Sequence, residues 1–168
     1  NDLGDDYTAI HLRWLSGQCP WRVKKLIETG LLDTAASCEM SASFVKDILK
    51  SSGRLNKPIL LFTDYQRPDI VERLAQDRTI GEQVKIIPKA SMNVFGEMML
   101  GMLSSAFIGQ PASTLSTNIG AVRLAFGYDD SNYVFLQQNK KEGTDKETNE
   151  GSDAKWIENP KSMCSMLK

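Results

Sequence analysis

The chain has 168 residues, of which 41% are hydrophobic and 24% are charged, and this composition is typical of a globular domain with its own core. The 20 basic and 21 acidic side chains leave a net charge of −1, which gives no general attraction for nucleic acid or an anionic membrane. No apolar run reaches the roughly 18 residues that a membrane-spanning helix needs, so we expect neither a nucleic-acid partner nor membrane contact.

The first predicted elements are one strand and two helices. The stretch 7–14 is apolar and β-branched before it turns polar, which predicts a buried strand that ends at its polar residues. Apolar residues at helical spacing predict a helix over 20–32. A second helix is predicted over 42–53, where Ser41 or Ser43 caps its start and a glycine ends it.

The middle of the chain predicts two further strands with a helix between them. The run KPILLFTD over 57–64 predicts a buried strand that ends in a threonine and an aspartate. A helix follows over 67–77, with Pro68 near its first turn, where the missing amide proton of proline costs nothing. The run EQVKIIP over 82–88 predicts the third strand.

An almost entirely apolar stretch over 93–106 predicts the next helix. Its methionines, Met98, Met99 and Met102, are expected to belong to the core. The short run AFIGQ over 106–110 then predicts a fourth strand that is fully buried.

The last predicted helix covers 113–127 and begins in a cluster of serines and threonines, and a fifth strand is predicted over 133–137. The stretch 137–153 contains no apolar residue, so we expect a disordered polar loop there. The segment 154–168 is expected to dock back onto the domain through four apolar side chains: Trp156, Ile157, Met163 and Met166.

Alternating strands and helices predict an α/β fold, a parallel sheet flanked by helices on both faces. We expect this domain to span 1–136. Ligands of such sheets bind beyond the carboxyl ends of the strands. The sequence therefore predicts that unusual polar residues gather at this edge.

Polar residues do follow the predicted strands. His11 and Arg13 end the first strand, and Asp64 ends the second. The fourth strand runs into four hydroxyl side chains within the five residues 113–117, where a helix begins. A helix N-terminus offers free N–H groups and a positive dipole end, and arginine adds a permanent bidentate donor. Together these groups predict a diphosphate site.

Each of these residues also has a purely structural interpretation. The hydroxyl cluster is able to cap the helix, and Arg13 is able to form a surface ion pair. His11 suits a hydrogen-bonded core position, and Asp64 suits a loop or a cap. Their convergence on one edge of one sheet favours the binding site.

The missing motifs narrow the class of ligand. No GxGxxG follows the first strand and no GxxxxGK[ST] is present, which excludes the usual dinucleotide site and the P-loop. No pair of carboxylates follows a strand as a metal anchor. A bound diphosphate is therefore expected to rely on arginine and the helix dipole, without a metal or cofactor.

The chain has three cysteines, Cys19, Cys38 and Cys164, at spacings that are not typical of a zinc site. Cys19 and Cys38 flank a short helical stretch and pair if the protein is secretory, and otherwise all three are free thiols. Because the chain begins at Asn1 rather than methionine, we expect a fragment or processed product, and its lack of a signal peptide indicates no compartment.

Three segments, IHLRWLSGQC, LLFTD and SSAFIGQPASTLSTNIGAVR, together resemble the GDP-fucose protein O-fucosyltransferases. In that family an HxR motif ends an early strand, a TD ends a later one, and a segment with FIG and a hydroxyl cluster opens the donor-binding helix. The resemblance covers roughly 7–127, in the family's order. It implies the C-terminal, Rossmann-like half of a GT-B glycosyltransferase.

The resemblance also implies a role for each matching residue. Arg13 would grip the β-phosphate of GDP-fucose and stabilise the leaving GDP, with His11 beside it. Asp64 matches the acidic residue of the TD, and Glu97 falls where the family places an aspartate that reads guanine. The residues that would wrap the phosphates and the sugar are Ser113, Thr114, Leu115 and Ser116.

This sequence departs from the family pattern in the run after Arg13, which lacks the family's polar continuation, and at three further positions. Leu115 replaces an aromatic residue, Gln110 replaces an asparagine, and Glu97 is one methylene longer than aspartate. The implied partners are GDP-fucose, a protein or glycan acceptor, and an N-terminal half of the same enzyme. The implied compartment is the lumen of the endoplasmic reticulum or Golgi.

Three functions remain open from the sequence. The first is inverting transfer of fucose from GDP-fucose to a serine or threonine hydroxyl, or to a glycan. The second is a non-catalytic module that binds a nucleotide sugar or a partner. The third, a flavodoxin- or receiver-like domain, ranks lowest because the acidic residues of NDLGDD precede the first strand instead of following it.

Overall fold

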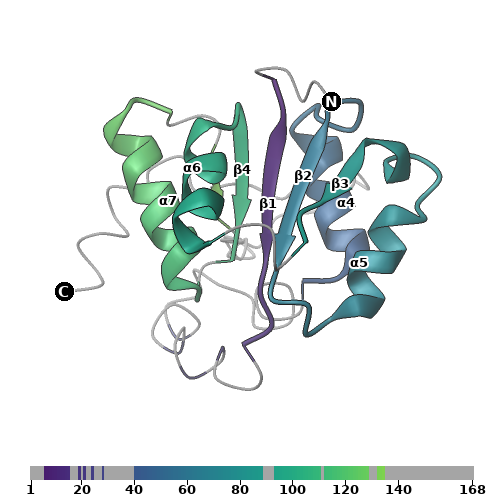
Figure 1. Cartoon of the computed structure of the whole chain (residues 1–168), viewed down its shortest axis with the longest axis horizontal. Coiled ribbons are helices and arrows are strands. Elements are labelled where there is room, and N and C mark those ends of the chain that lie inside the picture. The colour runs from purple at the N-terminus through teal and green to yellow at the C-terminus, as the bar shows by residue number, and fades with distance from the viewer. Residues whose placement is uncertain are drawn as a thin grey trace, which may run out of the picture.

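The computed structural model describes residues 6–15, 40–88, 93–110, 112–128 and 132–134, together with four single residues, Cys19, Trp21, Lys24 and Glu28. Five strands form one parallel sheet in the order β3-β2-β1-β4-β5 (Figure 1). The strands are β1 Thr8–Leu12, β2 Ile59–Thr63, β3 Val84–Ile86, β4 Ala106–Gly109 and β5 Asn132–Val134. The helices are α4 Ala42–Ser51, α5 Pro68–Ala75, α6 Val94–Leu103 and α7 Thr114–Ala125, and a 3-10 turn, η1, spans Gly81–Gln83. The predicted parallel α/β fold is confirmed.

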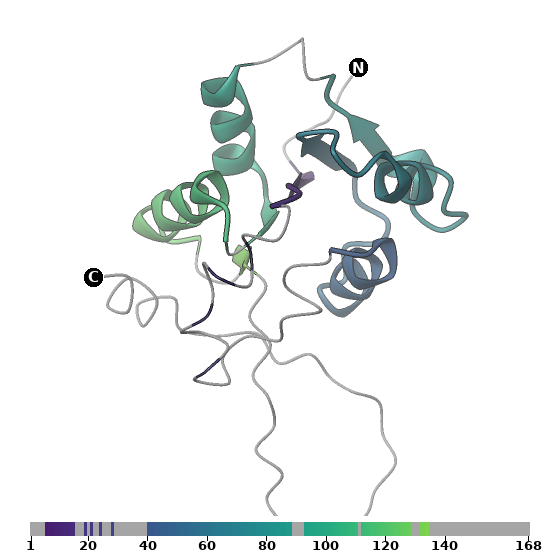
Figure 2. The same ribbon diagram turned by 90° about the horizontal axis from the view of Figure 1, so that it is seen from below.

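Two apolar cores lie on opposite faces of the sheet. Ile10 and Leu12 of β1 pack with α4 and α5 on one face. Ala9 belongs to the other face, where α6 and α7 pack over Phe62 and Phe107. The two helix pairs lie on opposite sides of the sheet in Figure 2. Since successive side chains of a strand point to opposite faces, β1 contributes alternately to both cores.

The ends of α4 and α5 follow from their sequences. The hydroxyl of Ser41 accepts a hydrogen bond from the backbone N–H of Phe44 at 3.2 Å, which caps α4 as predicted. The chain leaves α4 through Gly53, whose φ of +68° suits glycine. Pro68 is the first residue of α5, and Ile70, two residues further along, lies on its buried side.

The strand order places a topological switch beside β1. The chain builds β1, β2 and β3 outward in one direction and then returns to place β4 on the other side of β1. This order matches the first five strands of a Rossmann sheet, whose ligands bind at the carboxyl ends of the strands where the order reverses. The strands run downward in Figure 1, so this edge is at the bottom. The carboxyl ends of β1 and β4 are therefore the place to look for a site.

Two glycines let α7 pack closely against its neighbours, α6 and β4. A Cβ on Gly101 of α6 would lie 2.8 Å from the Ile119 side chain of α7. A Cβ on Gly109, the last residue of β4, would lie 2.8 Å from the Ser116 Cβ. Contacts this short do not occur between real side chains, so both glycines permit the approach of α7.

One prediction for the core is wrong. Met98 and Met102 pack against the apolar cluster, but the side chain of Met99 is 50% exposed. Successive residues of a helix point about 100° apart, so Met98 and Met99 do not face the same core, and only Met98 and Met102, four residues apart, share the buried side. The outer face of α6 is therefore apolar and open.

Several predictions fall outside the described residues. Of the helix expected over 20–32, only Trp21, Lys24 and Glu28 are described, and their backbone is helical. The loop expected over 137–153 and the docking segment over 154–168 lie outside entirely and stay predictions. Within the described parts of the chain, no helix is long and apolar enough to cross a membrane.

Candidate functional site

Arg13 follows the last residue of β1 at the carboxyl edge of the sheet. Its side chain is 52% exposed, and its Nε lies 3.9 Å from Oδ2 of Asp64, the residue after β2. An ion pair this long and this exposed holds the arginine only weakly. Arg13 therefore forms a surface ion pair while its guanidinium stays accessible to a ligand, so this geometry fits both the structural and the binding interpretation.

Asp64 links the loops that follow β1 and β2. Its Oδ2 accepts a hydrogen bond from the backbone N–H of Trp14 at 3.2 Å, and its Oδ1 accepts one from the N–H of Gln66 at 3.2 Å. Tyr65, which lies between Asp64 and Gln66 in the chain, has a φ of +59°, which is uncommon for a residue with a side chain. Asp64 thus fixes the shape of this edge as well as facing Arg13.

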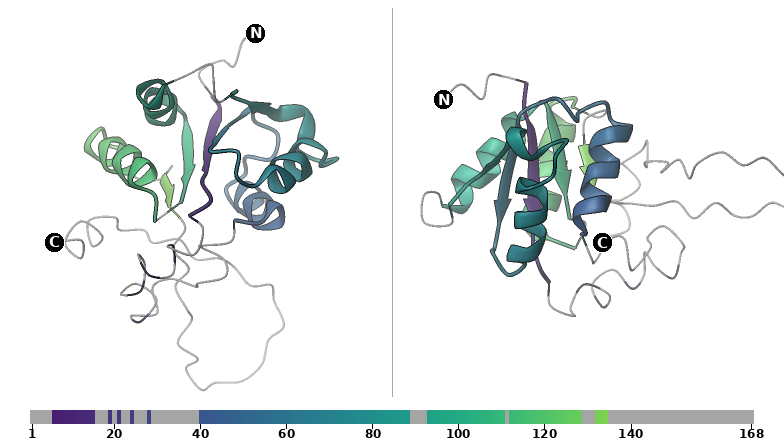
Figure 3. Two further views of the ribbon diagram at one scale, coloured as in Figure 1. Left: turned by 60° about the horizontal axis from the view of Figure 1, so that its bottom comes forward. Right: turned by 90° about the vertical axis from the view of Figure 1, so that its right-hand side faces the viewer.

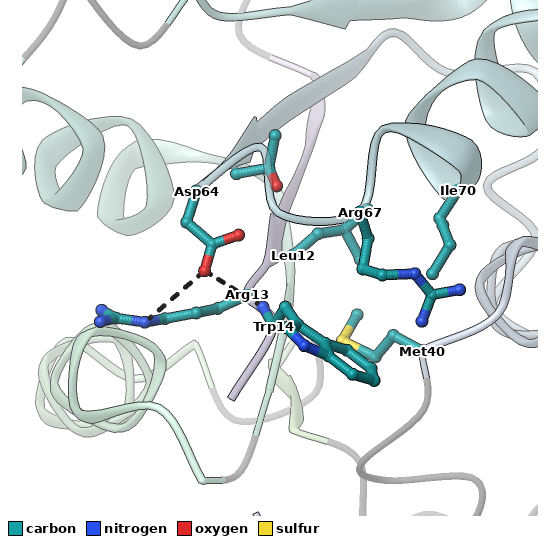
Figure 4. Close-up of a pocket in the computed structure, with 8 residues that line it drawn as sticks. Leu12, Arg13, Trp14, Met40, Asp64, Arg67 and Ile70 are labelled. Carbon is teal, nitrogen blue, oxygen red and sulfur yellow. Dashed lines mark hydrogen bonds and ion pairs between the residues drawn. The ribbon is translucent and has the colours of Figure 1, made fainter. Parts of the chain in front are cut away.

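A pocket opens between these two loops (Figure 4). Arg13 and Trp14 leave the strand on opposite sides, as alternation along an extended chain requires. The Arg67 guanidinium lies over the Trp14 ring, 4.8 Å from its centroid. Leu12, Met40 and Ile70 form the apolar floor on the face of α4 and α5.

His11 lies on the opposite face of β1, toward α7. Its Nδ1 is 2.8 Å from Oγ of Ser116, which also accepts a hydrogen bond from the backbone N–H of Gln110 at 3.0 Å. The imidazole stacks on Phe62 and is 4% exposed. This chain of contacts joins the ends of β1 and β4 to the first turn of α7. Since Arg13 is two residues beyond His11, it extends from the same face of the strand.

Burial is the main reason that the pKa of His11 falls to about 4, and the positive charge of Arg13 lowers it further. The imidazole is therefore neutral at pH 7. Because an unfolded histidine binds its proton near pH 6.5, the unfolded state gains protons first as the pH falls. His11 suits a positioning role better than that of a general acid.

We expect the only histidine of the chain to make the fold sensitive to mild acid. Between about pH 6.5 and pH 4 the free energy of unfolding should decrease by about 3 kcal/mol because of His11 alone. Urea unfolding at several pH values measures this change. The same series on a His11→Asn variant gives the pH dependence that comes from the carboxylates, and this is subtracted from the wild-type value. An equal pH dependence in both proteins would contradict the assignment.

The N-terminus of α7 has polar groups with no partner. Ser113 occupies the N-cap position, but its hydroxyl caps no backbone N–H. Its Oγ and both side-chain polar atoms of Gln110 are buried and have no hydrogen-bond partner in the part of the chain that the structure describes. Buried polar groups in folded proteins are nearly always hydrogen-bonded, so three such atoms at one helix start are unusual. A polar ligand at this helix start would satisfy them.

Glu97 projects from the first turn of α6, on the same side of the sheet as α7. Burial raises the pKa of its carboxyl group, and the positive charge of Arg13 partly opposes this rise. The fold therefore brings Glu97 and Arg13 within electrostatic reach of each other. A partly buried carboxyl group and an exposed arginine thus lie near each other at this edge.

Comparisons of the chain with protein-family models, curated proteins and solved structures find no match. The assignment of a ligand to this site therefore depends on the geometry of its residues and on the resemblance of its sequence motifs. In the described portion of the chain, no group of three or more histidine, cysteine, aspartate or glutamate side chains is placed to hold a metal ion.

Most of the predicted site residues meet at this edge, with different exposure. Arg13 and Thr114 are exposed, whereas His11, Ser113 and Ser116 are buried. Leu115 lies in the first turn of α7, and its side chain is partly buried against the apolar core. The cysteine predicted to pair, Cys19, is disulfide-bonded, but Cys38 and Cys164 lie outside the described residues, so the Cys19–Cys38 pairing stays a prediction.

Sequence reasoning missed two features of the site. Gln110 was treated only as a departure from a motif, although a polar residue directly after the buried run AFIG was a visible signal. The stacked pair of Trp14 and Arg67 had no such signal, because residues 53 positions apart meet only through the parallel pairing of β1 and β2.

Proposed function

We propose that the chain is the C-terminal, donor-binding half of an inverting GT-B fucosyltransferase that moves fucose from GDP-fucose to a serine or threonine hydroxyl. One observation carries the proposal: Arg13 follows β1 at the topological switch, and at the end of the neighbouring strand β4 the Gln110 amide and the N-cap hydroxyl of α7 have no partner among the described residues. This combination of a cation, free N–H groups and unsatisfied polar atoms suits a diphosphate.

The proposed reaction places developing charge at this edge. The bond between C1 of fucose and the β-phosphate oxygen breaks, and its electron pair leaves with GDP. The acceptor oxygen bonds to C1 from the opposite side, and its proton goes to a base or water outside the described residues. Arg13 and the α7 N-terminus stabilise the negative charge on the leaving phosphate, which is where preorganised donors contribute most. No metal is required in this mechanism.

Glu97 is proposed to select guanine. Its carboxylate accepts hydrogen bonds from N1–H and the exocyclic amine of guanine, groups that adenine and uracil do not present in this arrangement. A disulfide at Cys19 is consistent with the oxidising lumen of the endoplasmic reticulum or Golgi.

We expect Glu97→Gln to weaken GDP binding about tenfold or more and to abolish the preference for GDP over ADP, because the amide cannot accept both bonds. The wild-type affinity should also fall as the pH is lowered, because protonation of the Glu97 carboxyl group removes the acceptor of both hydrogen bonds. Since burial raises the pKa of Glu97, the carboxylate protonates earlier in this fall than an ordinary glutamate does. Calorimetric titration measures both effects, and unchanged selectivity in the variant would refute the role of Glu97.

The reaction is tested on the complete protein, including its proposed N-terminal half. Incubation with GDP-fucose and a library of serine- and threonine-containing peptides should yield peptides heavier by one deoxyhexose. Labelling of glycans instead would support the alternative acceptor. If the protein bound GDP without labelling either, the non-catalytic module would be the better description.

A further inference from the structure

The outer face of α6 carries an apolar stripe, defined by Phe95, Met99 and Leu103. Their side chains are 73%, 50% and 66% exposed, and Val94 beside them is 56% exposed. Residues four apart lie above one another on a helix, so the three form one continuous row. Figure 3 shows α6 at the edge of its layer beside α7.

A surface helix normally turns charged residues to solvent, and α6 does not. Glu97 is the single charged residue among its ten. The side of α6 next to the stripe packs on the core through Met98 and Met102, and Gly101, opposite the stripe, meets Ile119 of α7. A helix that is apolar on all sides is typical of one that is covered on all sides. Within the described residues, the outer side of α6 has no such cover.

We propose that the C-terminal segment 154–168 of the same chain covers the α6 stripe. The segment has the apolar side chains that such a cover needs, Trp156 and Ile157 in one pair and Met163, Met166 and Leu167 at helical spacing. It carries three lysines and one glutamate, so its charge does not oppose docking beside Glu97. This docking does not depend on the nucleotide site.

The chain leaves the sheet in the right place for this contact. Strand β5 lies at the edge of the sheet next to β4 and touches α7, which in turn packs against α6. The stretch 137–153 that follows is entirely polar. An unstructured chain of this length would span roughly 20–25 Å, which is enough to cross helices about 10 Å wide. The stretch 137–153 is thus long enough to bring 154–168 to α6, and because it has no apolar residue it does not itself cover the stripe.

Hydrogen exchange on the whole chain tests the proposal against a chain that ends at Asp153. Removal of 154–168 should make the amides of α6 exchange about tenfold faster, while those of α4 stay unchanged and the protein stays a monomer by light scattering. The α4 amides report whether the shortened chain still folds.

A full-length variant gives the same readout without truncation. Trp156→Asp with Ile157→Asp should also speed exchange in α6, whereas Lys140→Ala with Lys141→Ala in the polar stretch should not. In a Leu103→Asp background, the truncation should add little, because contacting residues are not additive. Unchanged exchange in α6 after both the truncation and the double aspartate substitution would overturn the proposal. A wild-type dimer that Leu103→Asp dissociates would also overturn it, in favour of a second copy of this chain as the cover.

Discussion

On the proposed mechanism, replacing Arg13 with alanine is expected to lower the transfer of fucose by the complete protein about 10²- to 10³-fold, the range for removal of one preorganised donor to a developing charge. GDP binding should weaken less, by roughly 10- to 100-fold, since a single charged hydrogen bond contributes about 1.5–3 kcal/mol in the ground state. The larger effect on transfer arises because negative charge on the phosphate grows as the sugar leaves. Initial rates with GDP-fucose, together with calorimetry of GDP, separate the two losses.

Arg67 provides the matched control. It is the other arginine that lines the pocket, and it lies on the far side of Trp14 from Arg13 (Figure 4). Arg67→Ala should leave GDP affinity within about twofold of the wild type. Arg13→Lys keeps the charge but loses the paired N–H donors of the guanidinium, so its GDP affinity should lie between those of the wild type and Arg13→Ala. Equal losses from the Arg13 and Arg67 substitutions would show that general positive charge is involved, and not a specific phosphate contact.

Replacing Arg123 with methionine is expected to cost about 3–5 kcal/mol of unfolding free energy, because it leaves several buried carbonyl oxygens without a donor, at about 1–3 kcal/mol each. Arg123 of α7 is fully buried, and its Nη1 donates to the carbonyl oxygens of Gly101, Met102 and Ser104 at the end of α6. The last carbonyls of a helix have no backbone donor within it. The guanidinium supplies one here, shares the Gly101 carbonyl with the Ser104 hydroxyl, and complements the negative end of the helix dipole. Burial lowers the pKa of Arg123 to about 10, and the side chain stays charged at pH 7.

Urea unfolding at neutral pH measures this loss. Arg73→Met is the control, because Arg73 lies exposed in the last turn of α5, where a substitution typically changes stability by less than about 0.5 kcal/mol. Arg123→Lys should restore part of the stability, since the ammonium keeps the charge but cannot reach all the carbonyls. A loss below about 1 kcal/mol for Arg123→Met would contradict the capping role.

Local sequence signals were sufficient for most of the fold. Ser41 and Pro68 marked helix starts by chemistry that operates within one turn, and the apolar runs of β1, β2 and β4 were recognisable because both their faces are buried. The strand order followed less directly. The alternation of elements predicted a parallel sheet, but only the long return from β3 to β4 places the switch beside β1.

The sequence was less informative where several elements meet. Arg123 was read as one more residue of a helix, because its role depends on the end of α6, about 20 positions earlier. Met99 was assigned to the core because composition alone does not reveal which side of an apolar helix is open. The lack of a cap at Ser113 was equally hidden, since a serine before a helix normally predicts the opposite.

The central claim is a guanosine diphosphate site that Arg13 and the α7 N-terminus form without a metal. Calorimetric titration of the complete protein with GDP, ADP and UDP in the presence of EDTA tests it most directly. We predict one site for GDP, at least about tenfold tighter than for either other nucleotide and weakened by Arg13→Ala. Absence of GDP binding, or equal binding of all three diphosphates, would contradict this assignment.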